Sequence, residues 1–286
     1  MLTIAELISL ANASSFSDVI IDFEARESGR TREEIWQEME KNLETMNAAV
    51  QRGLTGVESV TGFSGRDAEK LDIYLKNNRS FSGIETIKAA RNAIATNEVN
   101  AAMGVICATP TAGSAGVCAG VINMVKESRN LTHEQQIKFL FAAGAVGLSI
   151  ANQASISGAQ GGCQAEIGSA SAMASAGLVE IAGGTPEQCG HAVALTLMNT
   201  MGLICDPVAG LVEIPCINRN AMGASLALMT ADMALAGIES VIPADEVIQA
   251  MHQVGKKMPS CFKETAEGGL ATTPTGLKIT EQLFGK

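Results

Sequence analysis

Three cysteines occupy the two stretches of this sequence that are best suited to hold a metal. Cys163 follows a pair of glycines in GAQGGCQAE, and Cys205 and Cys216 bound the string CDPVAGLVEIPC, each close to a proline. A thiol at the start of a helix has a lowered pKa, because backbone N–H groups and the helix dipole favour the thiolate, the form that binds metals. Proline and glycine fix the two loop thiols in place, so they can face inward. We therefore treat these three residues as candidate metal ligands.

The spacing of the cysteines does not by itself decide between a metal site and a buried core. The sequence has no Cys-x-x-Cys, so a zinc ribbon or a ferredoxin-type cluster has little support. Free cysteines are also among the most buried residues. The total of seven is odd in a chain that is not small, which favours reduced thiols over disulfides. Three cysteines lie within small-residue helical stretches and are expected to pack in the core: Cys107, Cys118 and Cys189.

The string TPTAGSAG, residues 109–116, is a second candidate site. Its glycines allow close approach of the backbone, its hydroxyls can donate hydrogen bonds, and a helix that starts directly after it would attract an anion. This combination predicts a cradle for a substrate carboxylate, although a tight turn between two helices is the alternative. The residues assigned to the cradle are Thr109, Thr111, Gly113 and Ser114.

The sequence offers three histidines as candidate bases. His133 has the position of a first-turn helix residue and His252 that of a surface residue, so His191 is the candidate catalytic residue, with a satisfied core histidine as the alternative. Arg219 is predicted to bind a carboxylate, and the alternative is a solvated charge at a helix start. Lys263 and Glu264 form either part of the site wall or a solvated run. Further polar residues are expected to support the site by hydrogen bonds: Asn152, Gln160, Glu166, Asn199, Asp206, Glu213 and Asn218.

Three long strings carry a resemblance to a known family: GAQGGCQAEIGSASAMAS, HAVALTLMNTMGLICDPVAGLVEIPCINRNAMGA and TPTAGSAG. They resemble the alpha chain of the iron–sulfur-dependent L-serine dehydratases (L-serine ammonia-lyases). The resemblance runs from the N-terminal helices to KETAEGGLATTPTG at 263–276. It implies a [4Fe–4S] cluster held by Cys163, Cys205 and Cys216, and an oxygen-sensitive enzyme of amino-acid catabolism and gluconeogenesis that converts L-serine to pyruvate and ammonia.

Three thiolates would leave one iron of such a cluster without a protein thiolate. An iron of this kind acts as a Lewis acid, as an open zinc site does, and eases the departure of the substrate hydroxyl. A base removes the Cα proton, and the aminoacrylate that results gives pyruvate and ammonia.

The resemblance also implies a separate beta chain that bears a Ser-His-Thr motif. This sequence contains no Ser-His-Thr, so a complete active site is expected only together with that partner. The alternative is a non-catalytic iron–sulfur electron-transfer protein, which needs a fourth protein ligand. Cys261 is the candidate for that ligand.

The elements that position these residues are predicted to be helices, because apolar residues recur at three- and four-residue spacing and alternating strand patterns are scarce. We expect an all-α or nearly all-α, compact multi-helix body with Gly-rich functional loops. We expect one domain over 1–286, with an N-terminal helical segment (about 1–60) packed on a catalytic helical core (about 80–286). The predicted helices span 3–12, 31–52, 67–76, 85–104, 114–128, 133–152, 164–182, 186–202, 219–237 and 244–256.

Composition and charge exclude several classes of protein. Of 286 residues, 47% are hydrophobic and 17% charged, which is too apolar for a disordered chain. The net charge of −10 comes without a basic stripe, which argues against a nucleic-acid partner. The start, MLTIAELISLANASSF, has no basic region typical of a signal peptide. The uncharged stretches 99–125 and 139–165 contain many polar residues, so we expect buried elements of a cytoplasmic protein with no membrane partner.

Overall fold

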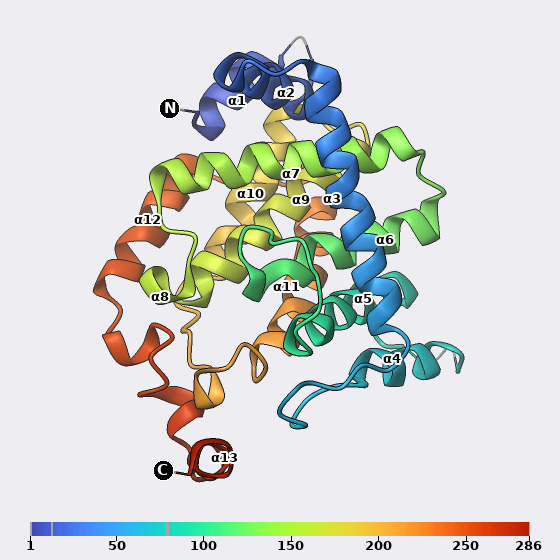
Figure 1. Cartoon of the computed structure of the whole chain (residues 1–286). Helices are drawn as coiled ribbons and strands as arrows, with labels where there is room; N and C mark the ends of the chain where they lie inside the picture. Colours follow the sequence, from blue (N-terminus) through green and yellow to red (C-terminus); the bar gives the residue numbers. More distant parts are fainter. Residues whose placement is uncertain (1, 13, 78–79, 286) are drawn as a thin grey trace.

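A computed structural model describes residues 2–12, 14–77 and 80–285, and the regular secondary structure of this part of the chain is helical (Figure 1). Its only β-type pairings are two single bridges, Glu58–Gly65 and Cys205–Lys263, so the predicted all-α class is confirmed. The longer helices are α1 Ile4–Ala11, α2 Phe16–Ser28, α3 Arg32–Gly53, α4 Asp67–Leu75, α5 Ile84–Ala101, α6 Ala115–Arg129, α7 His133–Gln153, α9 Ser169–Ile181, α10 Pro186–Met198, α11 Cys216–Leu235, α12 Ala244–Lys257 and α13 Pro274–Phe284.

Short helical turns lie between the longer helices, and most of them border the site described below. They are η1 Ala112–Ser114, α8 Gly158–Gly161, the π-helical turn η2 Gln164–Gly168, η3 Val208–Gly210, η4 Ser260–Phe262 and η5 Gly269–Thr272. A π-helical turn widens the helix locally and is frequent at functional sites.

Four helices begin with the same local device, a capping box. In each, a threonine hydroxyl accepts a hydrogen bond from the backbone N–H three residues on, and the side chain there accepts one from the threonine N–H. Each box satisfies two of the donors that a helix start leaves unpaired. Local sequence is sufficient to create these starts, in the pairs Thr3–Glu6, Thr31–Glu34, Thr132–Gln135 and Thr185–Gln188.

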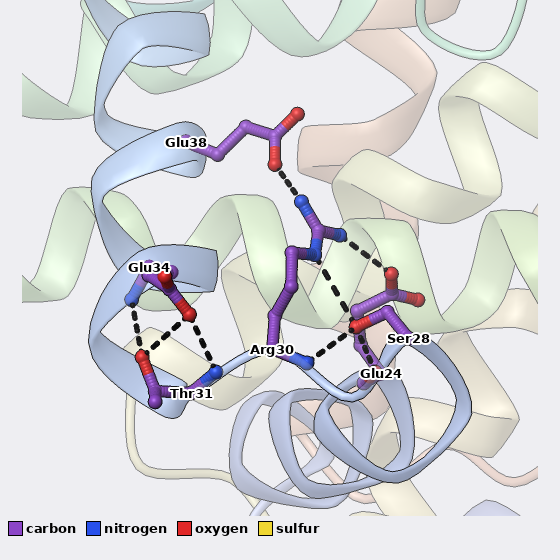
Figure 2. Close-up of polar contacts among 6 residues, drawn as sticks. All are labelled: Glu24, Ser28, Arg30, Thr31, Glu34 and Glu38. Carbon is purple, nitrogen blue, oxygen red and sulfur yellow. Dashed lines mark hydrogen bonds and ion pairs between the residues drawn. The ribbon is translucent and has the colours of Figure 1, made fainter.

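The turn from α2 to α3 shows such a start in detail (Figure 2). The guanidinium of Arg30 lies between Glu24 of α2, at 2.7 Å, and Glu38 of α3. The Glu34 carboxylate accepts from the backbone N–H of Thr31 at 2.8 Å. These ion pairs are about 40–60% exposed, so they contribute little to the stability of the fold.

Helix α9 runs through the middle of the body and packs against α6, α7, α10 and α11 (Figure 1). Its sequence, SASAMASAGLVEI, is buried from Ser169 to Val179 because small side chains let the neighbouring helices come close. The pair α5–α6 is equally tight, since a Cβ on Gly120 would lie 2.7 Å from the carbonyl oxygen of Ala89. Larger side chains such as Phe139 fill the remaining space, each stabilising the fold by ~1.5–3 kcal/mol.

Most predicted helices are confirmed to within a few residues, and the differences lie near the candidate site. The predicted helix 164–182 divides into the π-helical turn η2 and α9, and the predicted helix 219–237 begins three residues earlier, at Cys216. Helix α13 was not predicted, although Thr273 caps it and Pro274 occupies its first turn.

Within the described residues, no single helix has both the length and the apolar character needed to cross a membrane. Among these residues, only α1 and α2 taken together meet that criterion. The two helices form a bent pair, and they meet it by length and composition alone.

Candidate metal centre

The three predicted ligand cysteines come from separate segments; two of them, Cys163 and Cys205, meet beside Glu166, and Cys216 lies outside this close group but near enough for its pKa to respond to Cys163. Cys163 precedes η2, Cys205 lies in an extended segment, and Cys216 is the first residue of α11. All three are buried, with exposed fractions of 1%, 1% and 6%. The sulfur atoms of Cys163 and Cys205 and a carboxylate oxygen of Glu166 all lie within 4.8 Å of one another. The π-helical turn carries Glu166, so this carboxylate and Cys163 belong to one short segment.

The thiols influence each other's ionisation. The pKa of Cys163 is lowered, first by a hydrogen bond from the Cys205 thiol and also by the positive charge of Arg219, although burial acts in the opposite direction. The same hydrogen bond, together with burial, raises the pKa of Cys205. Burial raises the pKa of Cys216, and a negative charge on Cys163 raises it further. Of the three thiols, Cys163 is the one whose pKa is lowered, and the causes are the Cys205 thiol and Arg219 rather than a helix start; Cys216 is near enough to respond to its charge.

Arg219 contacts the cysteine site rather than open solvent. One of its nitrogens donates to Cys163 Sγ at 3.2 Å and to the carbonyl oxygen of Ile204 at 2.7 Å. The other donates to Asp206 Oδ1 at 2.8 Å, and Asp206 is only 3% exposed. The second oxygen of Asp206 accepts from the backbone N–H of Leu270 at 2.7 Å. The guanidinium is thus engaged by a protein carboxylate, and the predicted substrate-binding role of Arg219 stays a prediction.

The TPTAGSAG loop meets the cysteine site through Glu166. The Thr111 hydroxyl donates to Glu166 Oε1 and lies 3.1 Å from the Ser114 hydroxyl, which in turn donates to the carbonyl oxygen of Thr109 at 3.0 Å. A Cβ on Gly113 would lie 2.7 Å from Glu166 Oε1, so only glycine fits against the carboxylate. Burial raises the pKa of Glu166. All four residues predicted for the cradle therefore lie beside the cysteine site.

Two buried asparagines hold this loop in place, and sequence reasoning did not single them out. Asn220 donates to the carbonyl oxygens of Gly113 at 2.7 Å and Cys216 at 2.9 Å, and it accepts from the backbone N–H of Gly116 at 3.1 Å. Asn97 of α5 donates to the Gly113 carbonyl oxygen at 3.1 Å. The only available signal was the position of Asn220, one helical turn after Cys216.

The C-terminal segment closes the site from another side. The backbone N–H of Cys205 donates to the carbonyl oxygen of Phe262, and the N–H of Glu264 donates to that of Cys205, both at 2.8 Å. Glu264 has a positive φ of 65°. Its carboxylate approaches Gly158 of α8, where a Cβ would lie 3.4 Å from Glu264 Oε2, 3.2 Å from Glu166 Oε2 and 2.9 Å from Cys205 Sγ. Glu264 therefore belongs to the site wall.

The histidines lie elsewhere. His191 of α10 accepts a hydrogen bond at Nδ1 from the backbone N–H of Ser240, and none of its contacts in the described chain reaches a cysteine. His133 pairs with Glu40 from the first turn of α7, and His252 borders a small cleft between α8 and α12. The catalytic role of His191 stays a prediction.

Other polar candidates divide into two groups. Glu166 and Asp206 contact the site directly, as described above. Glu213 instead accepts hydrogen bonds from Thr61 at 2.9 Å and Ser64 at 2.7 Å and so holds the 57–66 loop. The contacts or the exposure of the remaining candidates place them outside the group around the cysteines: Asn152, Gln160, Asn199 and Asn218.

The remaining cysteines differ in their surroundings. Cys118 and Cys189 are buried among helices, where their thiols donate to the carbonyl oxygens of Ala170 and Ala176, each at 3.7 Å. Burial raises the pKa of Cys118 to about 12. Both therefore pack in the core, as predicted. Cys261 is half-buried and does not belong to the converging donors of the described chain.

Comparison with known proteins identifies the family of this chain. The family "Serine dehydratase alpha chain" matches residues 11–271. The "Probable L-serine dehydratase, alpha chain" of Bacillus subtilis is 58% identical over 99% of this chain and 95% of its own length. The "L-serine dehydratase, alpha chain" of Peptoniphilus asaccharolyticus is 42% identical over 97% and 96% of the two chains. The "L-serine dehydratase" of Streptomyces coelicolor is 37% identical over 93% of this chain but 59% of its own length. This chain therefore belongs to the serine dehydratase alpha-chain family.

Proposed function

We propose that this chain is the alpha chain of an L-serine ammonia-lyase, which dehydrates L-serine and releases pyruvate and ammonia. Membership of the serine dehydratase alpha-chain family supports this activity. The names of two relatives as alpha chains support a separate partner chain, and the longer Streptomyces coelicolor protein is consistent with a partner that is fused in some relatives. We place the enzyme in the cytoplasm.

The observation that carries the proposal is the pair of buried thiols Cys163 and Cys205 beside Glu166, with the buried thiol of Cys216 near enough to respond to charge on Cys163. Soft thiolates suit zinc and iron–sulfur clusters, and the family resemblance favours a [4Fe–4S] cluster. The donor types fit such a group, because these three cysteines would provide three sulfurs and the close group of donors in the described chain contains no fourth cysteine. When bound, a cluster with three thiolate ligands supplies a Lewis acid for the departing hydroxyl.

The residues of this chain have separate tasks in the proposed reaction. We assign the substrate carboxylate to Thr111 and Ser114, which lie together beside the start of α6. Their hydroxyl protons are engaged by Glu166 and by the Thr109 carbonyl oxygen, so each would exchange that hydrogen bond for one to the substrate. Arg219 and Asp206 hold Cys163 and the C-terminal segment in place. The base that removes the Cα proton comes from the partner chain more readily than from His191, because the His191 ring is engaged with Ser240.

Anaerobic reconstitution with iron and sulfide, in the presence of the partner chain, tests this function. The loaded complex should form pyruvate from L-serine and lose activity in air. Absence of pyruvate with a fully loaded cluster would contradict the proposal, and full activity of metal-free protein would contradict the role of the cluster.

The electron-transfer alternative makes a different spectroscopic prediction. It requires a fourth protein ligand and a cluster that is reduced reversibly without binding substrate. If L-serine changes the visible spectrum of the loaded cluster, substrate binds at or beside it and the alternative is excluded.

A further inference from the structure

We infer that Glu166 and Glu264 bind the α-ammonium group of the amino-acid substrate. The inference rests on the proposed function, since it assigns one group of L-serine to two side chains of the same site. It concerns recognition of the substrate and not the chemistry of elimination.

The two carboxylates approach a common point beside the metal-binding thiols. Glu166 Oε2 and Glu264 Oε2 lie 3.2 and 3.4 Å from the position that a Cβ of Gly158 would occupy, and Cys205 Sγ lies 2.9 Å from it. Glu166 comes from the π-helical turn and Glu264 from the segment that follows η4, so the fold brings them together over about a hundred positions of sequence. The two carboxylate oxygens therefore lie on the same side of Gly158, close enough together for one ammonium group next to them to reach both.

Neither carboxylate has a positive partner in the described chain. All ion pairs between the described residues involve other acids. Glu166 is only 8% exposed, and its single hydrogen bond, from Thr111, occupies Oε1 and leaves Oε2 free among these residues. Two ionised carboxylates side by side, one of them buried, are unfavourable unless a proton or a cation compensates the charge. A substrate ammonium supplies that cation with three N–H donors.

The backbone around the pair is shaped for this approach. Glu264 adopts a positive φ of 65°, which is uncommon for a residue with a side chain, and its N–H donates to the Cys205 carbonyl oxygen at 2.8 Å. Such conformations concentrate at functional sites, where the surrounding structure maintains them. At position 158 any side chain would collide with Cys205 Sγ and Glu166, so glycine keeps the space between the carboxylates clear.

The assignment completes a three-point recognition of L-serine. In the proposed function Thr111 and Ser114 face the carboxylate, the metal centre would face the β-hydroxyl, and the two glutamates face the ammonium group. The Thr111 hydroxyl donates its proton to Glu166 in this structure, so that hydrogen bond would be exchanged when Thr111 binds the substrate carboxylate. An enzyme built this way distinguishes an α-amino acid from the corresponding acid that has no amino group.

The test compares L-serine with 3-hydroxypropionate, which keeps the carboxylate and the hydroxyl but has no amino group. Dissociation constants are measured from the change that each ligand makes in the visible spectrum of the cluster-loaded enzyme after rapid anaerobic mixing. For Glu166→Gln and Glu264→Gln we expect L-serine to bind about 10- to 100-fold more weakly, the range expected for a lost hydrogen bond to a charged group. Binding of 3-hydroxypropionate should stay within about threefold.

Glu267→Gln is the matched control, since Glu267 is an exposed glutamate of the same segment. It should leave the affinity for both ligands unchanged.

The inference is wrong if both glutamine variants weaken the binding of L-serine and 3-hydroxypropionate equally, or if neither variant changes L-serine binding. It is also wrong if Glu166→Gln alters the spectrum of the ligand-free cluster, because Glu166 would then be a metal ligand. If Glu166→Gln fails to load a cluster, the affinity of the Glu264→Gln variant for L-serine tests the inference on its own. Pyruvate formation by the unmodified loaded enzyme tests the proposed function independently.

Discussion

The Asn220 side chain donates a hydrogen bond to the carbonyl oxygen of Gly113, at 2.7 Å and across 107 positions of sequence. The same carboxamide accepts from the N–H of Gly116, so it holds both ends of the turn that carries Ser114. It also donates to the carbonyl oxygen of Cys216. One fully buried side chain therefore joins the start of α11, where a candidate ligand lies, to the predicted carboxylate cradle.

We expect Asn220→Ala to loosen the cradle without removing the metal site. Three hydrogen bonds are lost and the buried backbone groups they satisfied are left unpaired, which costs about 2–4 kcal/mol of unfolding free energy. Steady-state kinetics should show a KM for L-serine raised about tenfold or more with a smaller change in kcat.

Asn123→Ala provides the control for this substitution. Asn123 is a buried asparagine whose amide donates only within α6, to the Ala119 carbonyl oxygen at 3.0 Å. It should lower stability but leave KM unchanged. Equal effects of the two substitutions on KM would show that Asn220 has no specific positioning role.

Gly269→Ala is expected to disturb the segment that closes the cysteine site. Gly269 has a φ of +61°, and a Cβ there would lie 2.3 Å from Asp206 Oδ2, the atom that accepts from Leu270. The substitution adds a steric collision to the backbone strain of about 1–2 kcal/mol for a left-handed residue. We expect a loss of more than 3 kcal/mol in unfolding free energy, together with poorer cluster loading.

The control is Gly237→Ala, which lies at a φ of +87° with no atom within 4 Å of the added Cβ. It should show the backbone strain alone and load a cluster normally. Chemical unfolding measures the free energy of unfolding, and the iron content measures cluster loading. A similar loss of stability in the two variants would mean that the Asp206 contact does not restrain this segment.

The cysteines should divide into two functional groups. Cys163→Ala, Cys205→Ala and Cys216→Ala should each abolish the visible absorption of the reconstituted cluster, because each removes one converging sulfur. Cys118→Ala and Cys189→Ala should keep that absorption and lose about 1 kcal/mol or more of stability through buried packing. Retention of the absorption in all three variants of the first group would place the ligands elsewhere.

Sequence reasoning succeeded where local chemistry decides the structure. The Thr132 cap and the start of α7 follow from neighbouring residues alone, and so does the helical turn after Cys163. The amphipathic pattern of α3 likewise predicted its length to within a residue at each end. The three ligand candidates depended on residue type and on the family resemblance, since spacing alone favoured a packed core over a metal site.

The parts that could not be predicted depend on contacts between distant segments. Thr111 and Glu166 are 55 positions apart, and Asn220 and Gly116 are 104 apart. No pattern in either segment reveals its partner. The π-helical turn at Gln164–Gly168 was missed because its short run has no period of its own. The position of Glu264 beside Gly158 likewise depends on the tertiary fold.

Glu98 of α5 gives the protein a pH-dependent stability. The residue is fully buried. Its Oε1 accepts a hydrogen bond of 2.6 Å from the backbone N–H of Asp67, at the start of α4. Its Oε2 has no hydrogen-bond partner among the described residues. Burial raises its pKa from 4.5 to about 7, although the hydrogen bond from Asp67 acts in the opposite direction. The folded protein therefore holds a proton that the unfolded chain releases between these two values.

The sign of the effect follows from proton linkage. Between about pH 4.5 and 7 the folded state binds more protons at Glu98 than the unfolded state does, so the free energy of unfolding falls as pH rises. The contribution is fully present below the unfolded pKa and is lost once pH passes the folded one, a change of about 2–3 kcal/mol. Glu98→Gln keeps an acceptor for Asp67 without a charge, so urea unfolding at pH 5 and pH 8 should show a smaller difference. Glu44→Gln, at an exposed position of α3, should retain the full difference. An unchanged pH dependence in Glu98→Gln would mean that Glu98 does not carry this proton.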